Sequence, residues 1–222
     1  MLLEARDLSA TRTTESGTHV VLDGVDLGVE AGTLTDVVGP SGSGKTTLLL
    51  ALARLLPGAT GVLELDGVAA ERIPPQRWRR DVALLPQVPA LVPGSVGDNL
   101  LLPWRLRVRS HETPPSAEVL ARALADVGLA DVGLERDPSR LSVGQIARVA
   151  LLRVLLTRPR VLLADEPDAA LDDVSAAQVT RMTEAFVAEG GAVVRVRHLR
   201  LDERADRRFR LEGGKLSEVA DA

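Results

Sequence analysis

The clearest chemical signal in the sequence is one short loop, with the residue order Gly39, Pro40, Ser41, Gly42, Ser43, Gly44, Lys45 and Thr46. The loop fits the pattern G-x-x-x-x-G-K-[ST] in full, and it lies between an apolar run and a helical pattern, as this phosphate-binding motif requires. Its glycines let backbone N–H groups turn toward phosphate oxygens, and the helix start adds partial positive charge. We expect Lys45 to reach the terminal phosphates of a nucleotide and Thr46 to hold Mg²⁺, and we count the next residue, Thr47, among those that bind the nucleotide.

A second candidate for chemistry is the carboxylate pair Asp165 and Glu166, which follows the apolar run Val161–Ala164. A buried strand of a parallel sheet delivers its last residues to the edge where ligands bind. We therefore expect Asp165 to face Mg²⁺ through water and Glu166 to face the attacking water. A carboxylate in that place acts as general base, a role that contributes roughly 10²–10⁴-fold to rate. Two acids after an apolar run are mostly structural when they stand alone, and the complete phosphate loop makes the functional reading strong.

The segment Leu141–Gln145 supports two readings. Ser142 and Gln145 have the spacing of a capping box, so helix initiation alone would explain them. A capped helix start beside Gly144 is also an anion site. Taken in isolation, the segment favours the cap.

The elements that must position these residues alternate between strands and helices. Strands are predicted at Met1–Leu8, Val20–Val29, Leu34–Val38, Val62–Leu65, Val82–Leu85, Val161–Ala164, Ala192–Val196, Arg207–Leu211 and Lys215–Val219. Helices are predicted at Lys45–Leu56, Ala117–Val127, Val143–Thr157 and Val174–Glu189. This order indicates an α/β fold with a mostly parallel sheet. An N-terminal antiparallel hairpin with a mobile tip at Thr11–Thr18 precedes it, and a proline-rich helical subdomain is inserted between core strands.

Composition narrows the possible functions. The chain has 222 residues, a formal charge of −4 and no cysteine, so a thiolate metal site is excluded. No apolar stretch approaches the roughly 20 residues of a membrane span, so we expect neither a span nor a signal peptide. The pI near 5.5 argues against a general nucleic-acid binder. Aromatic residues make up 2% of the chain, and none precedes Trp78.

Taken together, the motifs resemble the ATP-binding subunit of an ABC transporter over essentially the whole chain. They follow the family's order: the phosphate loop, Gln87 at a strand end, the signature Leu141–Gln145, the Asp165–Glu166 pair, Ala169–Asp172 and a strand-closing His198. Five later motifs in the right order are not accidental. The run Asn99–Arg107 also looks like the Fet-type iron-exporter branch of the family, although that match is short.

The resemblance implies one ABC ATPase domain with a P-loop NTPase core, at about 1–87 and 158–222, and a helical subdomain at about 88–157. It implies a head-to-tail homodimer or pseudo-dimer, in which MgATP on one subunit's phosphate loop is closed over by Ser142, Gly144 and Gln145 of the other. Two such sites would form per dimer.

The resemblance also implies roles for single residues. Gln87 would contact Mg²⁺ and the water while linking the site to the membrane partner. Glu166 would polarise the water, and His198 would hold the γ-phosphate. Asp172 would communicate across the dimer interface. Seen alone, Gln87 reads as a turn residue, Asp172 as a helix cap and His198 as a surface histidine.

A transmembrane permease is the implied partner, docking near Gln87–Arg107 on the cytoplasmic face of the membrane, and no nucleic acid is expected. The apolar members of that surface would be Leu91, Val92, Leu100, Leu101, Leu102 and Trp104, with a rim of Arg105, Arg107 and Arg109. The same residues would equally well pack the subdomain. Both tryptophans, Trp78 and Trp104, are expected near this partner-facing region.

Some positions depart from the family pattern. The family usually stacks an aromatic residue on adenine, yet this chain has none in that region. Base recognition is therefore expected to be weaker, or to be carried by another group such as His19 or the Arg12 guanidinium. Val143 replaces a usual glycine, and Ala169 a usual serine. Hydrolysis is still expected.

Charged residues also lie in strands that are expected to be buried. Asp36 lies before the phosphate loop, and Arg195 and Arg197 lie before His198. A buried charge is costly unless it is paired. We predict an ion pair between Asp36 and Arg195, with Arg197 as the second choice, unless these side chains reach solvent at a sheet margin.

Three rival readings remain. The first is a soluble ABC-type ATPase that acts on a non-membrane partner, and the second is a P-loop kinase or GTPase. The third is a degenerate subunit that binds nucleotide without hydrolysing it.

Overall fold

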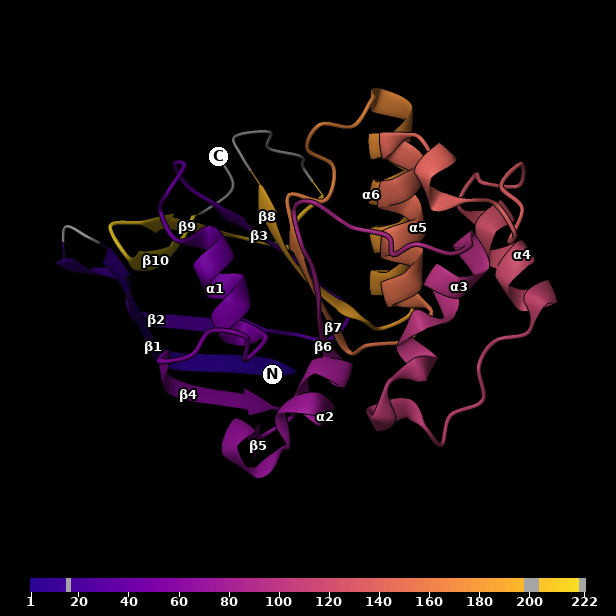
Figure 1. Cartoon of the computed structure of the whole chain (residues 1–222). Helices are drawn as coiled ribbons and strands as arrows, with labels where there is room; N and C mark the ends of the chain where they lie inside the picture. The colour runs from indigo at the N-terminus through magenta and orange to yellow at the C-terminus, as the bar shows by residue number, and fades with distance from the viewer. Residues whose placement is uncertain (15–16, 198–203, 220–222) are drawn as a thin grey trace. The chain divides into compact units, whose positions relative to one another are not determined.

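The computed structural model describes residues 1–14, 17–197 and 204–219, and its backbone contacts divide it into two compact units. Unit 1 contains Met1–Leu84, Arg160–Glu166 and Phe186–Ala222, and unit 2 contains Leu85–Pro159 and Pro167–Ala185. The segment Pro167–Ala185 thus groups with the helical part, whereas the sequence assigns it to the core. The units are described separately below, with the elements labelled as in Figure 1.

Unit 1 begins with an antiparallel sheet of order β2-β1-β4-β5. Its strands are β1 (Leu3–Thr14), β2 (Gly17–Val29), β4 (Thr60–Leu65) and β5 (Val68–Ala69). The N-terminal hairpin is confirmed, but its strands are longer than predicted. Cross-strand pairs continue from Thr11↔Val20 to Thr14↔Gly17, so most of the expected tip is paired strand. Threonine favours such pairing because its β-branched side chain suits a pleated strand.

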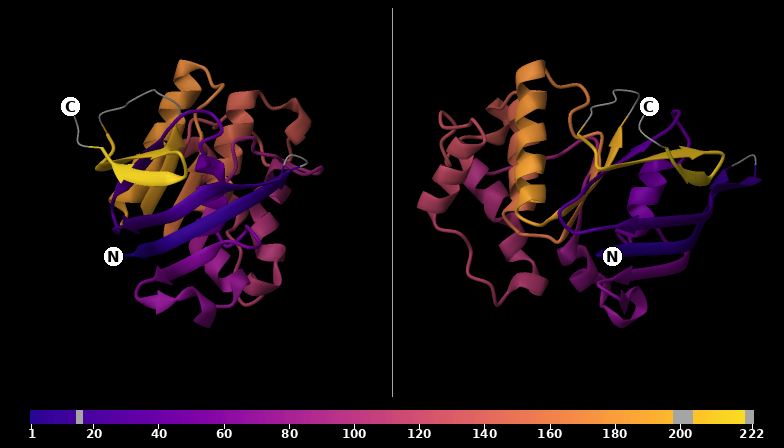
Figure 2. Two further views of the ribbon diagram at one scale, coloured as in Figure 1. Left: turned by 90° about the vertical axis from the view of Figure 1, so that its left-hand side faces the viewer. Right: turned by 180° about the vertical axis from the view of Figure 1, so that it is seen from behind.

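The second sheet has the order β10-β9-β3-β8-β7-β6. Its strands are β3 (Leu34–Val38), β6 (Val82–Leu85), β7 (Val161–Asp165), β8 (Ala192–Arg197), β9 (Arg207–Glu212) and β10 (Lys215–Glu218). Strands β9, β3, β8 and β7 pair in parallel, and every residue of β3, β7 and β8 is buried. Burial on both faces explains why these strands read as nearly continuous apolar runs. The terminal hairpin β9–β10 lies beside β2, where Asp23 N–H donates to Gly214 O (Figure 2).

Helix α1 (Lys45–Leu52) contacts β1, β2 and β7, so it lies between the two sheets of unit 1 (Figure 1). It ends four residues earlier than predicted. Arg54 adopts a left-handed φ of 54°. Arg54 N–H then donates to Ala51 O, and Leu55 N–H donates to Leu50 O. These two bonds form a Schellman turn, which stops the helix.

A short 3₁₀ turn, η1 (Ala70–Arg72), and the helix α2 (Pro75–Asp81) lie between β5 and β6. Trp78 on α2 is fully buried in the core of unit 1, and its Nε1–H donates to Leu52 O at 2.8 Å. The expectation that Trp78 lies near a partner-facing surface is therefore wrong. Its indole closes the C-terminal end of α1 instead.

Unit 2 is helical. Its helices are α3 (Val96–Leu101), α4 (Ala117–Asp126), α5 (Val143–Leu155) and most of α6 (Asp173–Ala188). Short 3₁₀ turns occur at η2 (Leu102–Arg105), η3 (Arg107–Arg109) and η4 (Pro138–Arg140). Helices α3, α4 and α5 pack against one another. Within the described residues, no helix has the length and apolarity needed to cross a membrane.

Candidate functional site

The loop from Gly39 to Gly44 joins β3 to α1 and needs glycine at both ends. A Cβ atom on Gly39 would lie 2.2 Å from Leu211 O, and one on Gly44 would lie 2.8 Å from Val21 Cγ1. Gly44 also has a φ of 102°, which L side chains rarely adopt. The close approach of β2 and β9 therefore fixes the loop in place and excludes larger residues there.

Lys45 lies inside this loop and is 6% exposed. Its Nζ donates to Gly39 O and Pro40 O, each at 2.9 Å. An ammonium group has three N–H donors, so one remains for a ligand. A buried cation at a helix start, wrapped by a glycine-rich loop, is suited to a phosphate group.

Thr46 and Asp165 meet at the end of β7. Thr46 Oγ1 donates to Asp165 Oδ2 at 2.8 Å, and Asp165 is 4% exposed. Asp165 Oδ1 is buried and has no hydrogen-bond partner among the described residues. Mg²⁺ prefers oxygen ligands and keeps several waters, so a hydroxyl and a carboxylate oxygen that lacks a donor fit this ion. Mg²⁺ or one of its waters would satisfy the buried oxygen.

Glu166 follows β7 with a left-handed φ of 48°. This conformation is strained for a residue with a Cβ atom and costs of the order of 1–3 kcal/mol. Its backbone N–H donates to Val196 O at 3.1 Å, so the position is held by β8. His198 lies outside the described residues.

In unit 2 the capping box at the start of α5 is confirmed. Gln145 N–H donates to Ser142 Oγ at 3.2 Å, and Ser142 N–H donates to Gln145 Oε1 at 3.0 Å. Ser142 is exposed, and Val143 is 67% exposed. The helix start therefore presents its first residues on the surface of the unit.

Gly144 is buried where α5 meets α6. A Cβ atom there would lie 2.1 Å from Ser175 Oγ. Ser175 N–H in turn donates to Asp172 Oδ1 at 2.9 Å. The hydrogen bonds from Ser175 hold the pKa of Asp172 below its ordinary value. Asp172 is thus a helix cap. Ser175, which was not predicted from the sequence, is the residue whose side chain leaves room only for glycine at position 144. The spacing Asp-x-x-Ser, from Asp172 to Ser175, is the sequence pattern from which this cap could have been predicted.

Gln87 is exposed just after β6 and lines a mainly apolar cavity of about 310 Å³ within unit 2. The walls come from the loop that follows Gln87, from α5, from the segment that leads into α6 and from α6 itself. They include Val88, Ile146, Leu151, Leu171 and Val179.

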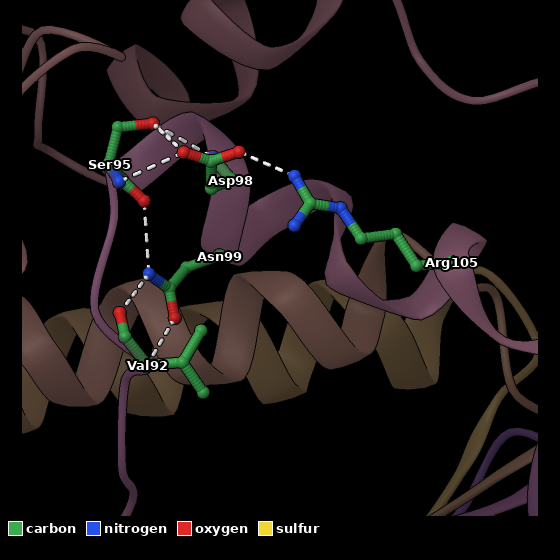
Figure 3. Close-up of polar contacts among 5 residues, drawn as sticks. All are labelled: Val92, Ser95, Asp98, Asn99 and Arg105. Carbon is green, nitrogen blue, oxygen red and sulfur yellow. Dashed lines mark hydrogen bonds and ion pairs between the residues drawn. The ribbon is translucent and has the colours of Figure 1, made fainter.

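The chain beyond Gln87 is held by a polar network around α3 (Figure 3). Asn99 is fully buried, and its Nδ2 donates to Val92 O at 2.9 Å and Ser95 O at 3.0 Å. Its Oδ1 accepts from Val92 N–H at 2.8 Å. Asp98 accepts from Ser95 and pairs with Arg105. Hydrogen bonds from Ser95 are the main cause that lowers the pKa of Asp98.

Arg153 extends this network to α5. Its Nη2 donates to Ala90 O at 3.0 Å, and its Nη1 reaches Asn99 Oδ1 at 3.4 Å. Partial burial lowers the pKa of the Arg153 guanidinium. The loop after Gln87 is therefore attached to the same helix that begins at Ser142.

The apolar patch expected between Gln87 and Arg107 is only partly exposed. Leu100 is fully buried, and Arg109 is 5% exposed, so neither belongs to a surface patch or its rim. Arg109 donates to Glu112 at 2.6 Å and lies over the Trp104 ring at 6.0 Å. Large apolar side chains that are exposed in this region are Val88, Val92 and Leu106.

The predicted ion pair in the sheet of unit 1 is confirmed. Arg195 Nε donates to Asp36 Oδ1 at 2.8 Å, and Arg195 Nη2 donates to Asp36 Oδ2 at 3.1 Å. The two residues are direct neighbours in the β3–β8 register, and both are 1% exposed. Arg197 is also buried, two residues further along β8.

The predicted site residues thus fall into two groups. Unit 1 brings together Gly39–Thr47, Asp165 and Glu166. Unit 2 contains Gln87, Ser142, Gly144, Gln145 and Asp172.

Comparison with known proteins gives a family and a fold. A family model described as "ABC transporter" matches residues 22–169. The rice protein STAR1 is 43% identical over 74% of the chain, and the chain spans only 46% of that relative. The probable iron export ATP-binding protein FetA of Escherichia coli is 33% identical, with 81% of this chain and 78% of FetA covered. The dimeric structure of MJ0796, a bacterial ABC transporter cassette, superposes with a TM-score of 0.83 at 25% identity over 100% of both chains.

Proposed function

Because this chain belongs to the ABC transporter family and is one of its ATPase domains, we propose that it hydrolyses MgATP to drive a separate membrane protein. The contact between Thr46 Oγ1 and Asp165 Oδ2 carries the proposal, together with the buried Asp165 Oδ1. It joins the phosphate loop to the strand end that supplies carboxylates. A P-loop NTPase needs a hydroxyl and an acid at that place to hold Mg²⁺.

The residues of unit 1 divide the work. Backbone N–H groups of the glycine-rich loop and Lys45 bind the phosphates. Thr46 and Asp165 would hold Mg²⁺, and the ion would neutralise charge on the phosphates when bound. Gln87, which belongs to unit 2, stays a further metal contact that the family resemblance implies. Glu166 polarises the attacking water, and its strained backbone, fixed to Val196 O, orients the carboxylate. Contact of His198 with the γ-phosphate stays a prediction, because this residue lies outside the described residues.

The base is the part of ATP for which this chain lacks the usual aromatic residue. Arg12 and His19 are exposed and lie opposite each other in the β1–β2 register. Val21, two residues after His19, abuts the phosphate loop at Gly44. We assign the base contact to this pair, because a guanidinium plane or an imidazole ring can stack on a purine. Arg12→Ala should weaken ATP binding more than inorganic phosphate binding.

Dimer closure on ATP is the second part of the proposal. The exposed start of α5 presents Ser142 with Gly144 and Gln145 behind it, and Asp172 lies beside them at the start of α6. A second copy would place its own phosphate loop against this surface. ATP binding drives closure only through contacts that are stronger in the closed state.

The membrane partner is proposed to dock on the chain near Gln87–Arg107. Val88 is 80% exposed and Leu106 is 56% exposed, while Asn99 and Arg153 hold the backbone between them. A fixed backbone that presents exposed apolar side chains lowers the ordering cost of binding. The chain would then work as a peripheral subunit on the cytoplasmic face of the membrane.

Glu166→Gln tests the activity. The variant should bind MgATP with unchanged affinity and lose at least ~100-fold in turnover, since a general base is worth roughly 10²–10⁴-fold. Glu189→Gln, an exposed acid of unit 1 outside the site, is the matched control. Unchanged turnover in Glu166→Gln would favour a binding-only subunit or reveal another base.

A pull-down of the chain tests the partner. Recovery of a transmembrane protein supports the transporter reading, and its loss with Val88→Asp would locate the docking surface. Recovery of a non-membrane partner alone would favour a soluble ABC-type ATPase.

A further inference from the structure

A second cavity, of about 510 Å³, lies at the C-terminal end of α1, opposite the end that begins at the phosphate loop. Its volume falls in the range of about 300–1,000 Å³ that is typical of small-molecule sites. The wall combines apolar and charged side chains, among them Leu8, Arg54, Leu55, Leu63, Glu71 and Arg79. All of these residues belong to unit 1. The ATPase roles assigned above use none of them.

Arg54 is held rigidly in this wall. Its Nη1 donates to both Ala70 O and Ile73 O, and its guanidinium carbon lies 5.7 Å from the centroid of the Trp78 ring. Its backbone has the left-handed φ of the turn that ends α1. The two carbonyls consume both Nη1 hydrogens, which fixes the orientation of the guanidinium plane.

The opposite edge of the same guanidinium is available. Nε and Nη2 of Arg54 have no hydrogen-bond partner within the part of the chain that is described. Elsewhere in this protein the same edge of Arg195 holds a carboxylate with two parallel bonds, at 2.8 and 3.1 Å. This fork matches the spacing of two carboxylate oxygens.

The charge balance of the cavity favours an anion. Arg79 adds a second guanidinium, and among the described residues it uses only Nη1, which donates to Arg54 O at 3.2 Å. Glu71 is an exposed acid of the wall and forms no ion pair with either arginine within the described chain. Two cations therefore face one acid beside apolar side chains. We propose that this cavity is a binding site for a small carboxylate with an apolar body, its carboxylate on Arg54 and its body against Leu8, Leu55 and Leu63.

The chain's two tryptophans provide the assay. The probe is decanoate, kept below its aggregation threshold, and the readout is the pair of indole N–H resonances in an NMR titration of the full chain. Trp78 lies under Arg54, whereas Trp104 lies in unit 2 and serves as an internal reference. Decanoate should shift the Trp78 resonance saturably. Acetate, which lacks the apolar body, and decanol, which lacks the charge, should bind at least ~10-fold more weakly.

Variants locate the probe. Arg54→Gln should weaken decanoate binding at least ~10-fold. Arg79→Gln removes one hydrogen bond to Arg54 O but keeps the backbone bonds of the turn after α1, and it should weaken decanoate binding several-fold. Arg77 is exposed and lies on the same helix as Arg79, α2, but outside the cavity, so Arg77→Gln should leave decanoate binding unchanged. Equal affinity for decanol would overturn the proposal, and so would indifference to both variants. Loss of the shift in Lys45→Ala would also overturn it, because it would place the probe at the phosphate loop. This test stands whether or not the chain hydrolyses ATP.

Discussion

Removing the charge of Asp36 would take away the carboxylate that accepts two hydrogen bonds from the Arg195 guanidinium in the middle of a sheet. Two hydrogen bonds join these two side chains, and the side chain of Asp36 is only 1% exposed and that of Arg195 only 2% exposed. Solvent therefore cannot replace the missing partner. Breaking a buried pair of this kind costs about 3–5 kcal/mol, because the remaining charge stays desolvated.

We expect Asp36→Asn to lower the free energy of unfolding by about 3 kcal/mol, at the low end of that range because the amide keeps one acceptor. At roughly 2–4 °C per kcal/mol for a chain of this size, the midpoint should fall by about 6–12 °C. Urea denaturation gives the free energy, and calorimetry gives the midpoint. The loss should be nearly independent of salt, since buried pairs are screened much less than exposed ones.

Two comparisons make the test decisive. Lys215→Gln breaks the exposed pair with Asp23, whose side chains are 63% and 57% exposed, and should change stability by about 0–1 kcal/mol. The double variant Asp36→Val with Arg195→Met removes both charges, and it should be far less destabilised than the sum of the single changes. Additive losses in the double variant, or an Asp36→Asn chain within about 1 kcal/mol of the unchanged protein, would refute the argument.

Three further changes test the helical unit. Gly144→Ala should destabilise the chain by about 1–3 kcal/mol through its collision with Ser175, and adding Ser175→Gly should restore denaturant stability. The pKa of Asp172 lies below its ordinary value of 3.8, so the stability that its charged side chain gives as a helix cap is present above about pH 4 and is lost as the pH falls further. The difference in melting temperature between the unchanged protein and Asp172→Ala should therefore become smaller below about pH 4. Arg153→Gln should accelerate amide exchange of the loop around Ala90, with exposed Arg122→Gln as the unchanged control.

The structure could be predicted from the sequence where a motif and the strand and helix that position it are adjacent in the chain. The phosphate loop carries its own strand, turn and helix signals, and β3, β7 and β8 were readable because burial on both faces demands apolar runs. The Asp36–Arg195 pair was also predictable, because a charge in a buried strand is costly unless an opposite charge lies beside it. These inferences need only the order of the strands and the cost of burial.

The parts that were missed depend on distant partners. Helix α3 has six residues and no useful periodicity. It is stabilised by the capping box of Ser95 and by Asn99, whose side chain is reached by Arg153, 54 residues away. The end of α1 depends on one strained residue, Arg54, which Ala70 O and Ile73 O hold in place. No pattern of neighbouring residues predicts the contact of Arg153 with Asn99 or that of Arg54 with Ala70 O and Ile73 O.

The two readings of Ser142 that the sequence left open can now be separated. The cap exists, and Gly144 is required by Ser175 regardless of any ligand, so loss of activity in Gly144 variants cannot by itself establish a functional role. Aspartate caps helices about as well as serine but adds a negative charge at an exposed position. Ser142→Asp should therefore keep the stability of α5 and still abolish ATP-driven dimerisation in light scattering, because the proposed partner on this surface is a phosphate group. Ser142→Thr should keep both, and unchanged dimerisation in Ser142→Asp would reduce the motif to helix initiation.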